Sequence, residues 1–329
     1  MAAVARIAVF FLGGTISMTG ADGTGAVVRL SGADLLRAPA VTGLGLRTDV
    51  VDFRAIGSSR LTIADLSELF AAADHAVVGG ADGVVVVQGT DTMEESSYLL
   101  DLWWTRPQPI VFTGAMRNPS LPGPDGPANL VAALRVAADP ACAGLGALVV
   151  MNDEVHAARL VAKRHTSSVG AFVSPGAGPI GRIEEGAVRI AARVARHTPV
   201  RAPVRAVRVP LIVSVLDDDG RLFDAVDDAD GLVVAAFGVG HLRPEVADRA
   251  AVIAKVRPVV LASRTGAGSV HVATYGGPGN EIDLVERGLI PAGNLDAYKA
   301  RLLLVALLAS GLSADDAAAA FAERVSGET

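Results

Sequence analysis

The chain has 329 residues, of which 51% are hydrophobic and 4% aromatic. This length exceeds what one hydrophobic core usually supports, so two domains are expected. A net charge of −6 disfavours nucleic-acid binding, and no uncharged apolar stretch reaches the roughly 20 residues that span a bilayer. Cys142 is the only cysteine, which excludes an intrachain disulfide and favours a reducing, cytoplasmic setting with a buried thiol.

Short runs of β-branched residues alternate with helical segments along the first half of the chain. This rhythm is typical of βαβ units, which build a parallel sheet covered by helices. The predicted strands are Val4 to Leu12, Val50 to Ile56, Gly83 to Val87, Ile110 to Thr113 and Leu148 to Met151.

Three helix starts carry clear capping signals. Ser31 precedes a helix with Asp34 at its third position, and Thr62 precedes a predicted helix over residues 63–78. The segment from Thr92 to Glu95 has the pattern of a capping box before a helix that continues from Ser96 to Trp104.

The pattern pauses where six arginines alternate with proline and alanine between Arg189 and Arg208, as in a solvated linker. It resumes with further strands and ends in two helices between Asn294 and Arg324, the last capped by Ser313. We therefore predict an α/β fold with a larger N-terminal parallel-sheet domain (1–190), a linker (191–208) and a smaller C-terminal α/β domain (209–329). The strands predicted in the smaller domain are Val207 to Val215, Gly231 to Phe237 and Pro258 to Ala262.

Two strand ends resemble each other, because each places glycine and then threonine where a buried strand emerges: Leu12-Gly13-Gly14-Thr15 and Gln88-Gly89-Thr90-Asp91. In an open parallel sheet, ligands bind beyond the carboxyl ends of the strands, so the two hydroxyls are candidates for one crevice. Taken singly, each segment could also be only a tight turn or a helix cap. The sequence has no dinucleotide-binding or phosphate-binding glycine loop and no cluster with metal-ligand spacing, so no cofactor and no metal are predicted.

The two threonine segments and several further motifs, in the same order, resemble the bacterial-type L-asparaginase family over nearly the whole chain. The most specific match is Gly89-Thr90-Asp91-Thr92-Met93-Glu94-Glu95. The other matches are Gly13-Gly14-Thr15-Ile16, Gly114-Ala115-Met116-Arg117, Asp125-Gly126-Pro127-Ala128-Asn129-Leu130, Met151-Asn152-Asp153, the Lys163 segment and Lys299-Ala300-Arg301.

The resemblance implies an amidohydrolase that converts L-asparagine to L-aspartate and ammonia. It implies Thr15 as the nucleophile, with Thr90, Asp91 and Lys163 assisting. Lys163 taken alone, beside Arg164 and His165, could equally be part of a solvated basic patch. The substrate-binding residues implied by the match are Gly14, Ser58, Ser59, Gly89, Ala115 and Glu281. The family supplies the carboxylate at the Glu281 position from a neighbouring subunit, which implies a homodimer or homotetramer.

Several departures from the family pattern bear on activation and specificity. Many members carry a tyrosine in the loop that corresponds to residues 17–29, a glycine-rich segment expected to be a mobile lid, but the tyrosines here lie elsewhere: Tyr98, Tyr275 and Tyr298. Ser59 replaces a glutamine, Gln88 a histidine and His241 an asparagine found in many members. Mixed asparaginase and glutaminase specificity therefore stays open, as does a catalytically weak amino-acid-binding protein on the same scaffold. An amidotransferase subunit is disfavoured, because such relatives carry a long domain before the first threonine motif.

Overall fold

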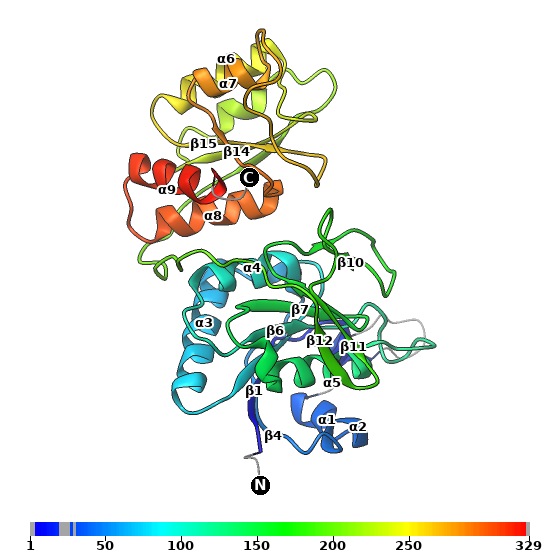
Figure 1. The fold of residues 1–329 in the computed structure, drawn as a ribbon. Helices are drawn as coiled ribbons and strands as arrows, with labels where there is room; N and C mark the ends of the chain where they lie inside the picture. Colours follow the sequence, from blue (N-terminus) through cyan, green and yellow to red (C-terminus); the bar gives the residue numbers. More distant parts are fainter. Residues whose placement is uncertain (1–3, 20–26, 29–30, 327–329) are drawn as a thin grey trace. The chain divides into compact units, whose positions relative to one another are not determined.

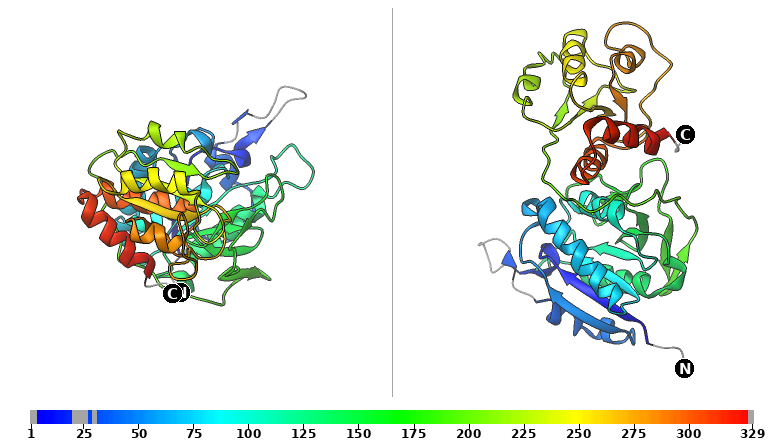
Figure 2. Two further views of the ribbon diagram at one scale, coloured as in Figure 1. Left: turned by 90° about the horizontal axis from the view of Figure 1, so that it is seen from above. Right: turned by 90° about the vertical axis from the view of Figure 1, so that its left-hand side faces the viewer.

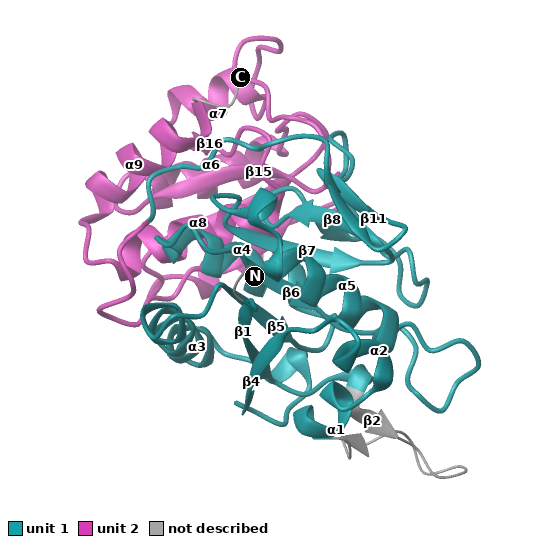
Figure 3. Cartoon of the chain, turned by 60° about the horizontal axis from the view of Figure 1, so that its bottom comes forward, with its two compact units in different colours: residues 1–199 teal, residues 200–329 magenta. Residues whose placement is uncertain are grey.

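The computed structural model describes residues 4–19, 27–28 and 31–326. The chain divides into two compact units, Met1–Pro199 and Val200–Thr329, which Figure 3 colours separately. Residues 191–210, all of which are described, contain no helix or strand. The domain limits and the linker over residues 191–208 remain predictions.

An eight-stranded sheet forms the centre of the first unit, in the order β12-β11-β8-β7-β6-β5-β1-β4. Strands β4, β1, β5, β6 and β7 pair in parallel, whereas β8, β11 and β12 extend the sheet in antiparallel pairs. The α/β class is confirmed, and the antiparallel strands make the sheet mixed. The bounds are β1 (Arg6–Phe11), β4 (Arg47–Asp52), β5 (Gly83–Val87), β6 (Ile110–Thr113), β7 (Ala147–Met151), β8 (Glu154–Ala157), β11 (Gly181–Glu184) and β12 (Ala187–Ile190).

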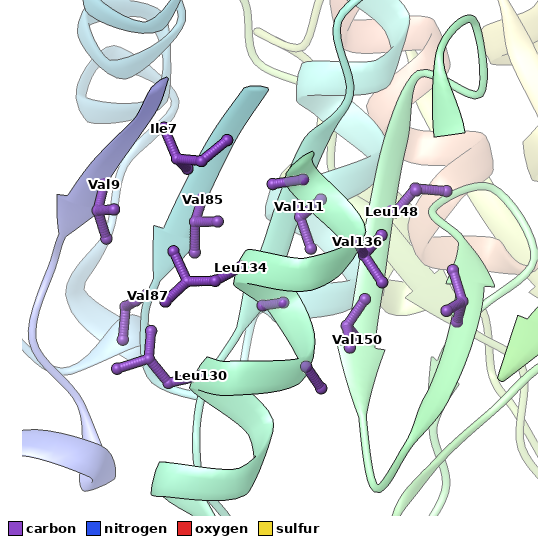
Figure 4. Packing of buried hydrophobic residues seen from close by; sticks show 14 of the residues in the cluster. Ile7, Val9, Val85, Val87, Val111, Leu130, Leu134, Val136, Leu148 and Val150 are labelled. Atoms are coloured by element: carbon purple, nitrogen blue, oxygen red, sulfur yellow. The ribbon is translucent and has the colours of Figure 1, made fainter. Parts of the chain in front are cut away.

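Helices cover both faces of this sheet (Figures 1 and 2). Helix α5 packs on one face, where apolar residues of β1, β5, β6 and β7 point toward it and form one buried cluster (Figure 4). Helices α3 and α4 pack on the other face. Burying one valine or leucine side chain stabilises the folded state by about 1.5–3 kcal/mol. The many buried side chains therefore hold these strands firmly in place. The helices are α1 (Gly32–Leu36), α2 (Pro39–Thr42), α3 (Ile63–Val78), α4 (Met93–Trp103) and α5 (Gly126–Ala138), with short 3-10 turns at Thr15–Ser17, Ser58–Arg60 and Pro140–Cys142.

The strand order creates a switch point next to β1. From β1 the chain crosses to β4 on one side and then returns to β5 on the other. In parallel sheets the two loops that leave such neighbouring strands diverge and form a crevice at the carboxyl edge. The segments that carry Thr15 and Thr90 leave β1 and β5, so the fold brings both to this crevice.

A parallel sheet in the order β13-β14-β15-β16 forms the second unit, with bounds Leu211–Val213, Leu232–Ala236, Val259–Ser263 and Ile290–Pro291. Helices α6 (Pro244–Ala254) and α7 (Glu281–Glu286) share a core with one face. Helices α8 (Ala297–Ala309) and α9 (Ala314–Ser326) pack against each other, and α8 also packs against β14 and β15. A 3-10 turn spans Arg221–Ala225. The smaller α/β domain is confirmed.

Most local predictions agree with the structure. Helix α3 has the predicted bounds, Ser31 and Thr62 form reciprocal capping boxes, and the Ser313 hydroxyl accepts a hydrogen bond from the Asp316 amide. The strand predicted from Val50 to Ile56 was misplaced, because β4 runs from Arg47 to Asp52. It is the edge strand of the sheet and half-exposed, so its polar start gives no buried run.

The capping box predicted at Thr92 is wrong. Helix α4 begins at Met93, but the Thr92 side chain makes no cap hydrogen bond. Its hydroxyl instead donates to the Ser58 carbonyl, 3.0 Å away, so a tertiary partner has taken the group that a local cap would use.

Candidate active site

Two glycines turn the chain sharply after β1. Gly13 and Gly14 have φ angles of +101° and +100°, which side-chain-bearing residues rarely adopt. A Cβ on Gly13 would lie 2.7 Å from the Ile56 carbonyl oxygen, and one on Gly14 would lie 2.4 Å from the Gly89 nitrogen. The turn therefore fits between the segments that follow β4 and β5, and it brings Gly14 against Gly89. Thr15 and Thr90 each follow directly on these touching glycines.

Lys163 links the second threonine to its neighbouring carboxylate. Its Nζ lies 2.9 Å from Thr90 Oγ1 and 3.0 Å from Asp91 Oδ1. Thr90 is buried and the Lys163 side chain is only 15% exposed, whereas the Asp91 side chain is 65% exposed. Lys163 is therefore directed at the second threonine and is not part of a solvated basic patch.

Ser58 lies beneath the second threonine segment. Its side chain is buried, and its Oγ accepts a hydrogen bond from the Asp91 amide at 3.1 Å. A Cβ on Gly89 would lie 2.7 Å from the same oxygen. Since the amide fills one acceptor position, the Ser58 hydroxyl hydrogen remains able to donate to a bound anion. Ser59, the adjacent predicted site residue, is exposed.

Ala115 lies in the turn that follows β6, and it is buried. A Cβ on the preceding Gly114 would be 3.5 Å from Thr90 Cγ2, so this turn borders the second threonine. Sequence reasoning assigned no role to Asp125 and Asn129, which support it. The Asp125 carboxylate accepts from the amides of Met116 and Arg117, and the Asn129 amide donates 3.0 Å to the Gly114 carbonyl.

The predicted lid lies largely outside the described residues. The backbone of Met18–Thr19 pairs antiparallel with Val27–Val28 as strands β2 and β3.

Glu281 belongs to the second unit, where it is fully buried. One carboxylate oxygen accepts from the amides of Thr274 and Tyr275, and the other lies 3.0 Å from His241 Nε2. Burial alone would raise the pKa of Glu281, but the backbone amides and His241 lower it below its ordinary value. The carboxylate is thus held ionised, and it fixes the segment around Tyr275.

The remaining motif matches have structural partners. Lys299 is buried, and its Nζ lies 2.8 Å from Asp296 Oδ2, while Arg301 Nε donates 2.7 Å to the Val209 carbonyl. Gln88 is buried, and its Nε2 donates to the Gly89 carbonyl and to Ser96 Oγ. The matches around Lys299 therefore stabilise α8, whereas Gln88 holds the peptide next to Thr90.

Three further features concern the cysteine, metal ligands and membrane-spanning helices. Burial raises the pKa of the Cys142 thiol to about 12, as expected for a structural cysteine. Over residues 4–19, 27–28 and 31–326, no three His, Cys, Asp or Glu side chains gather as metal ligands. In the same part of the chain, no helix combines the length and apolar character that crossing a membrane requires.

The fold and the site together define a two-unit α/β protein with hydroxyl, carboxylate and ammonium groups at a sheet switch point. Two family models match the sequence: "Asparaginase, N-terminal" over residues 6–196 and "Glutaminase/Asparaginase C-terminal domain" over residues 208–321. The chain therefore belongs to the L-asparaginase family of enzymes.

Individual relatives include L-asparaginases and an amidotransferase subunit. A probable L-asparaginase of Deinococcus radiodurans is 39% identical, over 98% of this chain and 99% of that protein. A glutamyl-tRNA(Gln) amidotransferase component of Haloquadratum walsbyi is 32% identical, over 91% of this chain and 70% of that protein. The crystal structure of a probable cytoplasmic L-asparaginase from Campylobacter jejuni superposes with a TM-score of 0.86 and 29% identity, covering 96% of this chain and 99% of that one.

Proposed function

We propose that this protein is a cytoplasmic L-asparaginase that hydrolyses the side-chain amide of L-asparagine to L-aspartate and ammonia, without a cofactor. The observation that carries the proposal is the short contact between Lys163 Nζ and Thr90 Oγ1, beside the close approach of Gly14 and Gly89 that Thr15 directly follows. Coverage of nearly the full length of an L-asparaginase relative supports the same substrate class.

In the proposed mechanism, Thr15 Oγ attacks the carboxamide carbon and forms a tetrahedral intermediate. The C–N bond then breaks, ammonia leaves with the proton taken from the hydroxyl, and water hydrolyses the ester on Thr15. The proton lost by the Thr15 hydroxyl reaches the leaving amine through Lys163, and Asp91 keeps the lysine oriented. The Thr90 hydroxyl and the backbone amides of the glycine turns stabilise the developing oxyanion, a contribution of about 10²- to 10³-fold per donor.

The site residues divide into two groups in this proposal. Ser58 and the neighbouring Ser59 hold the α-carboxylate, where the Ser58 hydroxyl is the buried donor. Gly14, Gly89 and Ala115 form the walls that let a small amide approach the two threonines.

The proposal is tested by ammonia release from L-asparagine with the wild-type protein and with Thr15→Ala and Thr90→Ala. Each variant should lose about 10²- to 10⁴-fold in kcat, since each lacks a group that acts in the transition state. Rapid quenching followed by peptide mass mapping should find the aspartyl ester on Thr15. Full activity in both variants would refute the assignment, and an ester on Thr90 would exchange the roles of the two threonines.

Three other functions share the scaffold. Equal turnover of glutamine and asparagine would identify a mixed glutaminase-asparaginase, and tight amino-acid binding without any ammonia release would identify a binding protein. Catalysed amide transfer to glutamate-charged tRNA would instead match the relatives that are amidotransferase subunits.

We further propose that Glu281 completes the site of a neighbouring copy in a homodimer or homotetramer. The support is the resemblance, which matches Glu281 to the carboxylate that the family supplies from a neighbouring subunit. A complementation assay tests it directly, because mixed oligomers of Thr15→Ala and Glu281→Ala chains contain sites with an intact Thr15 and an intact partner Glu281. Mixing the two inactive variants under subunit exchange should restore activity. An active monomer in size measurements, or no restoration, would refute sharing.

A further inference from the structure

The first turn of α4 and the two residues before it make three hydrogen bonds to segments that are distant in the sequence. Thr92 Oγ1 donates to the Ser58 carbonyl at 3.0 Å, and the amide of the adjacent Asp91 donates to Ser58 Oγ at 3.1 Å. Glu94 Oε2 accepts from the backbone amide of Lys163 at 3.1 Å. This turn is therefore tied on one side to the serine turn and on the other to the strand that carries the lysine.

The Thr92 bond is made at the expense of the helix. A threonine that precedes a helix normally accepts a bond from the amide two or three residues later, which stabilises the helix start. Thr92 occupies that position but makes no such cap. Departures from a local rule concentrate where a site requires a different contact. The diverted hydroxyl, together with the Asp91 amide, holds both the carbonyl and the side chain of Ser58.

The Glu94 bond acts on a strand with little other support. Strand β9 has only two residues, Ala162 and Lys163, and pairs with Phe172 and Val173. At 3.1 Å the bond from the Lys163 amide to Glu94 has the length of an ordinary backbone hydrogen bond, and it adds a contact that the two-residue strand does not otherwise have. Glu94 thus fixes the Lys163 backbone, from which the side chain reaches Thr90 and Asp91.

The geometry points to Thr92 and Glu94 as positioning residues with separable effects on the reaction. Thr92 sets the position of Ser58 and so acts on substrate binding, whereas Glu94 sets the position of Lys163 and so acts on proton transfer. This inference rests on the proposed asparaginase function, and it predicts that the two residues affect different kinetic constants.

Matched substitutions separate each hydrogen bond from the shape of the side chain. Thr92→Val keeps the shape of the side chain but cannot donate, whereas Thr92→Ser keeps the hydroxyl. Loss of one hydrogen bond corresponds to about a tenfold effect, so Thr92→Val should raise KM for L-asparagine about tenfold with kcat within about twofold. Thr92→Ser should restore the wild-type KM.

Glu94→Ala removes the acceptor, whereas Glu94→Gln keeps an oxygen at the same reach. Glu94→Ala should lower kcat about tenfold with KM within about twofold, and Glu94→Gln should recover most of kcat with an unchanged pH profile. A shifted pH profile in Glu94→Gln would show that the charge of Glu94, and not the position of Lys163, matters. That result would overturn the assignment of Glu94.

Ser313→Ala is the control for general destabilisation, since it removes the N-cap of α9 in the second unit. It should lower the melting temperature and leave both kinetic constants unchanged. The inference is overturned if Thr92→Val and Glu94→Ala change KM and kcat in the same proportion, or if Thr92→Ser fails to restore KM. Wild-type protein that releases no ammonia from L-asparagine would instead refute the proposed function, and this inference with it.

Discussion

Substitution of Gly14 by alanine tests whether the two threonine segments meet as the structure has them. The new Cβ would lie 2.4 Å from the Gly89 nitrogen and 2.6 Å from its Cα, both backbone atoms that cannot rotate away. Placing an alanine at a φ of +100° lowers the free energy of unfolding by about 1–2 kcal/mol. Forcing its Cβ into a packed contact lowers it by about 1–3 kcal/mol more. We therefore expect Gly14→Ala to destabilise the first unit by about 2–5 kcal/mol.

The matched control is Gly45→Ala in the same unit. Gly45 also has a positive φ, +66°, but a Cβ there would meet nothing within 4 Å. Gly45→Ala should therefore lower the free energy of unfolding only by the penalty for its backbone conformation, about 1–2 kcal/mol, and leave kcat unchanged. The difference between the two variants isolates the contact with Gly89.

Urea denaturation followed by tryptophan fluorescence measures this difference, because Trp103 and Trp104 are the two tryptophans of the chain and both are buried in the first unit. A displacement of about 1 Å between reacting groups lowers the reaction rate about 10²-fold. Gly14→Ala should therefore also lower kcat by about that factor. If Gly14→Ala is as stable as Gly45→Ala and fully active, the two glycine turns do not touch, and the shared crevice is wrong.

Three further predictions concern single groups. Lys163→Met keeps the length of the side chain without the ammonium and should lower kcat by about 10²- to 10⁴-fold in the ammonia assay; unchanged kcat would contradict the proton relay. The pKa of Cys142, raised by burial to about 12, predicts no reaction with a thiol reagent at pH 8 until urea unfolds the chain, and reaction of the native protein would contradict burial. Burial lowers the pKa of His156 below 6.5 although Glu154 opposes this, so the unfolded chain binds the proton more readily and stability should fall as pH drops below 6.5. The urea midpoint of His156→Asn should change less between pH 7 and 5 than that of the wild type, and an equal slope would contradict the prediction.

The sequence predicts those elements best whose signals are local. Helix α3 begins at its capping box, and its bounds follow because Thr62 and Asp65 satisfy each other without help from the rest of the chain. Strand β5 was also predicted correctly, since a wholly buried strand is an uninterrupted apolar run. Edge strand β4 has no such run, because one side of it meets solvent.

The site could be predicted only in part, for a physical reason. That Thr15 and Thr90 follow strand ends is visible in the sequence, but their proximity depends on β5 pairing with β1, which no local pattern specifies. Lys163 and Ser58 were identified through the family resemblance and not through spacing. The contacts of Thr92 and Glu94 escaped prediction because both residues fit a capping pattern, and only the folded chain supplies their partners.

The order of strands also has a consequence for folding. Strands β1 and β5 are neighbours in the sheet although α3 and other elements separate them in the chain, and Lys163 comes later still. Closing such long loops lowers the entropy of the chain before the stabilising contacts between the strands can form. Pairings between strands distant in the sequence therefore form late in folding. A nascent polypeptide that ends before Lys163 would carry both threonines without the ammonium, so we expect hydrolytic competence to appear only after the β9 hairpin has emerged from the ribosome.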